Sequence, residues 1–142
     1  MKFIFLFAVI SISAFASGTS YEFTNFSTAD DFNFQEVISQ KEISIVVFNR
    51  GYCPINDSKF DCFPFETKLE YLSPKIIGNY SNAQIINIDI ERNYIQQRYN
   101  FQRFPAVVFL LSGREVERID TYSNANDLII KTFETLSKFP SN

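Results

Sequence analysis

Three short, nearly continuous apolar runs constrain the fold of this chain most strongly. They read ISIVVF at residues 43–48, IINIDI at 85–90 and AVVFLL at 106–111. Runs of this length that are rich in β-branched residues are typical of strands buried on both faces of a sheet. Segments with helical periodicity lie between them. The pattern therefore predicts a central sheet with helices packed against it.

The remaining segments complete an alternation of strands and helices. Strands are predicted at 21–26, 43–48, 85–90, 106–111 and 116–119. Helices are predicted from a cap at Thr28 or Asp30 to about Gln40, and at 60–77, 91–99 and 124–138. The alternation predicts parallel pairing, and the Ser112-Gly113 turn predicts an antiparallel edge. The expected fold class is α/β, with a mixed central sheet and helices on both faces.

The first 16 residues, MKFIFLFAVISISAFA, predict a signal peptide. Lys2 supplies a positive start, the following apolar run is shorter than a membrane span needs, and Ala14-Phe15-Ala16 fits a small-residue cleavage motif. We expect residues 17–142 to form one domain in the secretory pathway, either in the lumen of the endoplasmic reticulum or secreted. No later apolar run predicts a membrane anchor.

The composition narrows the possible functions. The 142 residues include no histidine and two cysteines, and the formal net charge is -3. The absence of histidine excludes histidine general-base catalysis and removes the commonest metal ligand. Two cysteines cannot close a structural zinc site. We expect no cofactor and no metal, and the lack of a basic, aromatic-interleaved surface argues against a nucleic-acid partner.

Three N-x-[ST] sequons agree with passage through the secretory pathway. They begin at Asn25, Asn56 and Asn79, which are therefore candidate glycosylation sites.

The stretch INIDIERNYIQQRYNFQRFPAVVFLLSGREVERIDTY resembles the second half of thioredoxin-like domains of the protein disulfide isomerase type. In that family a strand ending in an acidic residue leads through a short helix to a cis-proline loop and a final hairpin. The resemblance implies that Pro105, preceded by Phe104, is cis. It also implies that extended peptides bind beside Tyr52, Phe104 and Pro105.

The segment VVFNRGYC resembles the strand that enters the active site of the same family, and Cys53 falls on the first cysteine of its C-x-x-C motif. Three departures imply a degenerate site. The motif itself is absent, Val47 stands where catalytic members have a buried acidic residue, and the loop after Cys53 is longer. Two alignments of the family's second cysteine are possible. It corresponds to Cys62 if residues have been inserted after Cys53, or to Lys59 if Pro64 corresponds to the proline that kinks the following helix in the family.

The two cysteines allow two interpretations. A Cys53–Cys62 disulfide would close a ten-residue loop and stabilise the fold by about 2–3 kcal/mol, and disulfides persist in the secretory pathway. Alternatively, Cys53 and Cys62 are catalytic, and the chain is a thiol–disulfide oxidoreductase or isomerase. We expect a redox-inactive or weakly active module that binds peptides or assists folding. Its partners would be polypeptide clients or a partner protein.

Overall fold

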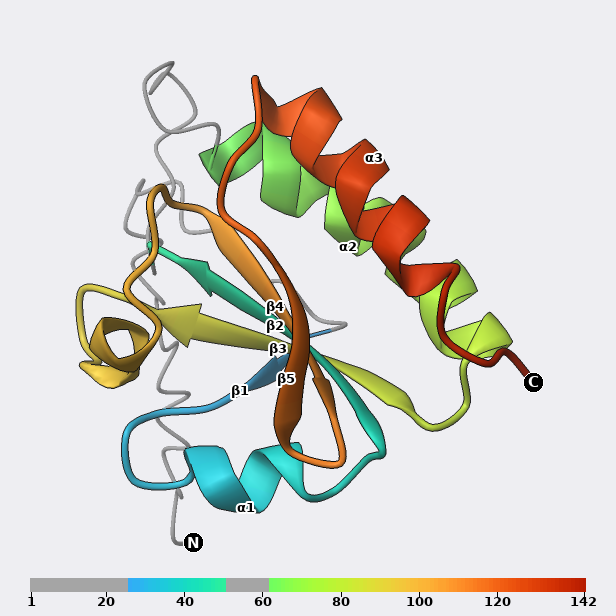
Figure 1. The fold of residues 1–142 in the computed structure, drawn as a ribbon, viewed down its shortest axis with the longest axis horizontal. Helices are drawn as coiled ribbons and strands as arrows, with labels where there is room; N and C mark the ends of the chain where they lie inside the picture. Colours follow the sequence, from blue (N-terminus) through green and yellow to red (C-terminus); the bar gives the residue numbers. More distant parts are fainter. Residues whose placement is uncertain (1–25, 51–61) are drawn as a thin grey trace, which may run out of the picture.

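The computed structural model describes residues 26–50 and 62–142. The predicted signal peptide, the sequon residues Asn25 and Asn56, and the site residues Tyr52 and Cys53 lie outside this range. The elements in chain order are β1 (Ser27–Thr28), α1 (Phe34–Ile38), β2 (Ile43–Asn49), α2 (Cys62–Asn79), β3 (Ala83–Asp89), the 3₁₀ helix η1 (Ile95–Arg98), β4 (Ala106–Leu111), β5 (Arg114–Ile119) and α3 (Ala125–Leu136) (Figure 1).

The five strands form one mixed sheet in the order β1-β3-β2-β4-β5. β1, β3 and β2 are parallel, whereas β4 runs antiparallel to β2 and β5 antiparallel to β4. Strand–helix alternation predicts a parallel β4, and this expectation is wrong. The connection from β3 to β4 contains only the four-residue η1, and the chain reverses at one end of the sheet instead of crossing it.

Helices cover both faces of the sheet, as expected: α2 and α3 pack on one face and α1 on the other (Figure 1). Each face has its own apolar core. The core under α2 and α3 contains Phe65, Phe109 and Leu128, and the core on the α1 side contains Phe34, Phe48 and Ile88. Burying one such side chain contributes about 1.5–3 kcal/mol. The two cores hold β2 rigidly in the centre of the sheet.

Asp30 caps the turn that leads into α1. Its carboxylate accepts the backbone amides of Phe32 and Asn33, and the Asn33 side chain in return accepts the amide of Asp30. These bonds satisfy amides that a helix start leaves without partners. Asp30 therefore caps the turn before the helix, whereas the N-cap of α1 is Asn33, without a side-chain cap bond, and the regular helix spans only the five residues from Phe34.

A proline lies inside α2, and a neighbouring serine compensates for it. Pro74 has no N–H, so it cannot donate to the carbonyl of Glu70 four residues earlier. The hydroxyl of Ser73, which is fully buried, donates to this carbonyl at 2.8 Å. The long helix therefore continues past the proline without an unsatisfied carbonyl at Glu70.

η1 is shorter than the predicted helix over 91–99, because a distant carboxylate defines its start. Asp31 accepts the backbone amides of Tyr94 and Ile95 at 2.9 and 3.0 Å. The Asn93 side chain accepts the amide of Asp31 at 3.0 Å. These bonds tie the chain before α1 to the start of η1. Among the described helices, none is long and apolar enough to cross a membrane.

Candidate functional site

The loop between η1 and β4 carries two of the predicted site residues. The Phe104–Pro105 peptide bond is cis, as the family resemblance implies. Pro105 is buried and Phe104 is half-buried. Since Ala106 pairs with Phe48, the loop lies at the end of β2 from which the chain continues toward Cys53.

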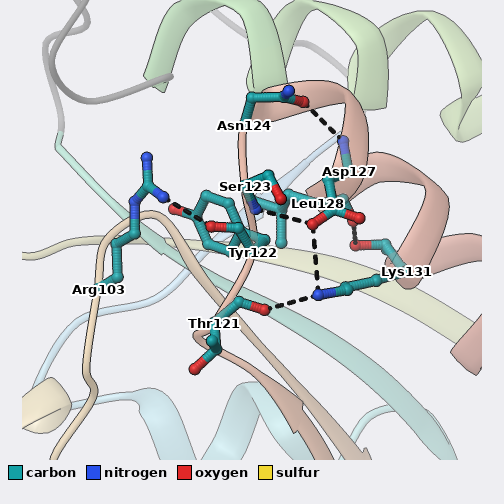
Figure 2. A network of polar contacts seen from close by, with 9 residues as sticks. Arg103, Thr121, Tyr122, Ser123, Asn124, Asp127, Leu128 and Lys131 are labelled. Carbon is teal, nitrogen blue, oxygen red and sulfur yellow. Dashed lines mark hydrogen bonds and ion pairs between the residues drawn. The ribbon is translucent and has the colours of Figure 1, made fainter.

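The carbonyl of Pro105 is fixed by a buried tyrosine. The Tyr122 hydroxyl donates to it at 2.7 Å, and Tyr122 is 6% exposed. Arg103 stacks over the Tyr122 ring at 4.4 Å and donates to the Tyr122 carbonyl at 2.7 Å (Figure 2). Burial strengthens such hydrogen bonds and makes their loss costly. The loop that contains Pro105 is thereby anchored to the segment between β5 and α3.

The same segment is tied to the start of α3. Asn124 caps the helix by accepting the amide of Asp127, and the Asp127 carboxylate accepts the amide of Ser123 (Figure 2). Lys131 lies 3.3 Å from that carboxylate and donates to the Thr121 carbonyl. A continuous set of polar contacts therefore runs from α3 to the Pro105 loop.

The backbone of Phe104 is open, in contrast to that of Pro105. Within the described residues, neither the amide nor the carbonyl of Phe104 has a hydrogen-bond partner. An amide and a carbonyl next to the end of a strand are the groups with which an extended peptide can pair. Counting the described residues alone, Phe104 therefore presents one unpaired donor and one unpaired acceptor.

A cluster of aromatic rings supports Phe104. Its ring meets Phe101 edge-on at 5.7 Å, Phe101 stacks on Tyr99 at 5.4 Å, and both contact Phe48. Burial raises the pKa of the Tyr99 hydroxyl. The cluster packs against the core on the α1 side of the sheet, which gives Phe104 a rigid base.

A hollow of about 260 Å³ lies beside Phe104. Its walls are Asn49, Arg50, Ile90, Glu91 and Phe104. Arg50 and Glu91 form an ion pair across it, with Nε and Oε1 3.5 Å apart. The hollow adjoins the unpaired backbone of Phe104 and offers space for a side chain next to a strand-pairing position.

Neither the protein-family models nor the curated proteins give a match to this sequence. The solved structures do give matches. A thioredoxin from Fasciola hepatica is 22% identical with a TM-score of 0.62, covering 81% of this chain and 100% of that one. A thioredoxin from Plasmodium falciparum is 20% identical with a TM-score of 0.61, covering 80% and 99%. Mitochondrial thioredoxin 3 from Saccharomyces cerevisiae is 16% identical with a TM-score of 0.60, covering 82% and 98%.

The chain has the thioredoxin-like fold. Identities of this size establish the fold, and a fold alone does not confer an activity. The chemistry of this thioredoxin-like domain must therefore be argued from its own residues.

Val47 lies in the middle of β2 and is fully buried in this thioredoxin-like domain. Its neighbours across the sheet are Asn87 and Val107. A valine cannot accept a proton at the position where the resemblance implies an acidic residue in catalytic members. Asn87 is polar, and its carboxamide oxygen is buried without a partner in the described part of the chain, but an amide is not a general base.

The remaining predicted site residues are described only in part. α2 begins at Cys62, while the side chain of Cys62 lies outside the described residues, as do Tyr52 and Cys53. Asn79 is the last residue of α2 and is exposed. The structure therefore places Phe104 and Pro105, among the predicted site residues, in the loop next to the end of β2.

Sequence reasoning missed Arg103, Tyr122 and Asn49 as parts of this site. Arg103 and Tyr122 lie in loops, where no hydrophobic periodicity marks them. Their contacts span 17 and 19 residues. Asn49 follows a run of apolar strand residues, and a polar residue at the end of a buried strand was the one available signal.

Proposed function

We propose that this thioredoxin-like domain binds extended polypeptide segments in the secretory pathway and has little or no dithiol–disulfide exchange activity. The observation that carries the proposal is the backbone of Phe104, whose amide and carbonyl have no partner among residues 26–50 and 62–142. An incoming strand can pair with its amide and carbonyl, and such main-chain bonds give affinity with little dependence on sequence.

The surroundings of Phe104 support this proposal. Peptide pairing at this edge would put a side chain of the bound segment next to the hollow lined by Ile90 and Phe104. Interfaces of this kind gain most from apolar contacts that exclude water from the main-chain hydrogen bonds. We therefore propose unfolded or extended clients with apolar side chains as partners.

We propose that redox activity is weak because Val47 stands where catalytic members of the family have a buried acidic residue. Exchange between a dithiol and a disulfide needs a thiolate and a route for protons. β2 reads ISIVVFN and carries no carboxylate that could take up a proton beside the thiols. The chain has no C-x-x-C motif, so a resolving thiol at Cys62 would lie further along the chain from an attacking thiol at Cys53 than in that motif.

Binding to a reduced and carboxymethylated unfolded polypeptide tests the proposal, because this probe has no thiol for exchange. Phe104→Ala should weaken binding by about fivefold or more, since it removes an apolar wall of the site. Tyr71→Ala is the control, because Tyr71 is an aromatic residue on α2 that is 81% exposed. Equal affinity of wild type and Phe104→Ala, or no binding by the wild type, would contradict the proposal.

A second candidate function is thiol–disulfide exchange by Cys53 with Cys62. The observation that favours it is the start of α2 at Cys62, since a helix N-terminus stabilises a thiolate. Reduction of insulin by the wild type, lost in Cys53→Ser, would establish this function instead.

The secretory location is proposed from the N-terminal segment and the sequons. Expression in a eukaryotic secretory host followed by mass analysis tests it. We expect a mature chain that lacks residues 1–16 and carries enzymatically removable glycan, with exposed Asn79 as the described acceptor. An intact N-terminus without glycan would contradict this location.

A further inference from the structure

A distant asparagine holds the sequon Asn79-Tyr80-Ser81 at the end of α2. The carboxamide oxygen of Asn142 accepts the hydroxyl of Ser81 at 2.7 Å and the amide of Ser81 at 3.0 Å. The carboxamide nitrogen of Asn142 donates to the Gly78 carbonyl at 3.2 Å, and the Asn142 amide donates to the Asn79 carbonyl at 2.9 Å. Asn142 therefore binds the sequon on both sides of Tyr80, and these four hydrogen bonds are called the Asn142 clamp.

Both segments that the clamp joins are fixed to the same apolar core. The ring of Phe139 stacks on the ring of Phe109, with ring centres 5.8 Å apart, in the core under α2 and α3. Tyr80 packs against this core from the end of α2. The segment that follows α3 therefore lies beside the end of α2, where Asn142 reaches the sequon (Figure 1).

N-glycosylation requires the sequon in a different state. The Nδ2 atom of Asn79 would form a bond to C1 of an oligosaccharide and lose one proton, while C1 breaks its bond to a lipid-linked diphosphate, which leaves. The transferring enzyme binds the sequon as an extended segment and recognises the serine or threonine hydroxyl, which is why the motif requires that residue.

The folded chain offers neither the extended segment nor the hydroxyl. Asn79 is the last residue of α2, and the Tyr80 amide still donates to the Ile76 carbonyl at 2.9 Å. The hydroxyl of Ser81 donates to Asn142. The side chain of Asn79 is nevertheless exposed, and the clamp uses only its carbonyl, so the clamp can still form after a sugar has been attached.

We infer that the Asn142 clamp closes the Asn79 sequon once the domain has folded, so that Asn79 accepts a sugar only during synthesis. Asn142 follows Ser81 by 61 residues, and the sequon is therefore synthesised before the residue that clamps it. The glycan part of this inference rests on the proposed secretory location; the contact of Asn142 with Ser81 does not.

Sugar transfer to the folded protein tests the closure. The unglycosylated mature chain, made in a bacterial host, is incubated with purified oligosaccharyltransferase and lipid-linked oligosaccharide, and mass mapping measures occupancy at Asn79. Occupancy should stay low in the wild type. Asn142→Ala should raise it by about fivefold or more, because the end of α2 opens more often without the clamp. Ser141→Ala, at the exposed preceding residue, is the matched control and should behave as the wild type does.

Translation of the full chain with endoplasmic-reticulum membranes tests modification during synthesis. Asn79 should be modified equally in the wild type and in Asn142→Ala, because the clamp forms only after residue 142 has been made. A chain that keeps residues 1–16 and carries no glycan would contradict the proposed location. A chain that loses residues 1–16 but carries no sugar at Asn79 would instead overturn this inference.

Amide hydrogen exchange tests the clamp without any glycan. The Ser81 amide donates to Asn142, so it should exchange about tenfold faster or more in Asn142→Ala than in the wild type. The Phe109 amide in β4 should exchange at the same rate in both, which separates local opening from a loss of global stability. Equal exchange at Ser81 in the two proteins, or equal occupancy at Asn79 in their folded forms, would overturn the inference.

Discussion

Arg118 donates to both carboxylate oxygens of Glu115, at 2.5 and 3.0 Å. Residues three apart on a regular strand point to opposite faces of the sheet. Here the β4–β5 register shifts between Phe109, which pairs with Glu117, and Leu110, which pairs with Glu115. The extra residue, Val116, forms a bulge that brings Glu115 and Arg118 onto one face.

This bulge lets Arg118 cover the aromatic cluster beneath Phe104. Its guanidinium lies 5.4 Å from the Phe101 ring centre and 5.8 Å from that of Tyr99, and it donates to the Tyr99 carbonyl. The hydrogen bond to Glu115 raises the pKa of Arg118, so the cation is maintained. Glu115 thus orients Arg118 over rings that support the candidate site.

Arg118→Ala should lower the free energy of unfolding by about 1 kcal/mol, because it removes a partly exposed ion pair and the ring contacts. Urea denaturation measures this change. Arg114→Ala is the matched control on the exposed start of β5 and should change stability by less than about 0.5 kcal/mol. Equal effects of the two variants would show that the ring contacts of Arg118 contribute nothing.

Ser73→Ala should destabilise the chain by about 1–3 kcal/mol, because the carbonyl of Glu70 then loses its donor next to Pro74. In a Pro74→Ala background the cost should be smaller, since an alanine at this position supplies a backbone amide to the same carbonyl. A double-mutant cycle by urea denaturation measures the difference. Additive effects of the two substitutions would contradict this account of α2.

Asp127 gives a defined pH dependence. The Ser123 amide, with Lys131, holds the pKa of the Asp127 carboxyl below its usual range. A carboxyl whose pKa is lower when folded contributes stability that is present above its unfolded pKa of about 4 and is lost as the pH falls through the folded pKa. Between about pH 5 and about pH 2, the melting temperature should therefore fall more for wild type than for Asp127→Asn.

Glu134→Gln is the control for this measurement, because Glu134 is an exposed acid on the same helix. Its melting temperature should follow that of the wild type across the same range. Parallel curves for wild type and Asp127→Asn would show that the contacts of Asp127 do not contribute to stability.

Reduction should lower the melting temperature of the mature chain by several degrees if Cys53 and Cys62 are bridged, because the bond contributes about 2–3 kcal/mol. Dithiothreitol should leave the melting temperature of the Cys53→Ser, Cys62→Ser double variant unchanged. Mass mapping must first show that the bond is present in the oxidised wild type. A loss of the bond without a change in melting would contradict a structural role.

Local patterns were sufficient to predict the main elements of the fold. The runs at 43–48 and 106–111 form the two central strands β2 and β4, because β-branched residues suit a sheet buried on both faces. Asn124 caps the final helix as a polar residue before an amphipathic segment should. The family resemblance supplied the cis bond before Pro105, which no local pattern identifies.

Features that depend on distant residues could not be predicted. Asp31 sets the start of η1 from 63 and 64 residues away. The anchoring of the Pro105 carbonyl depends on the hydroxyl of Tyr122, which lies 17 residues further along the chain. Such contacts exist only once the sheet has formed, so neither periodicity nor spacing can reveal them.

The central claim is that the open backbone of Phe104 binds extended polypeptide without thiol chemistry. An amide-resolved nuclear magnetic resonance titration of the Cys53→Ser, Cys62→Ser double variant with the reduced, carboxymethylated polypeptide tests it most directly. The account predicts that this thiol-free variant still binds and that the Phe104 amide shifts and becomes protected on binding. Binding that disappears with the cysteines, or that leaves the Phe104 amide unchanged, would contradict the account.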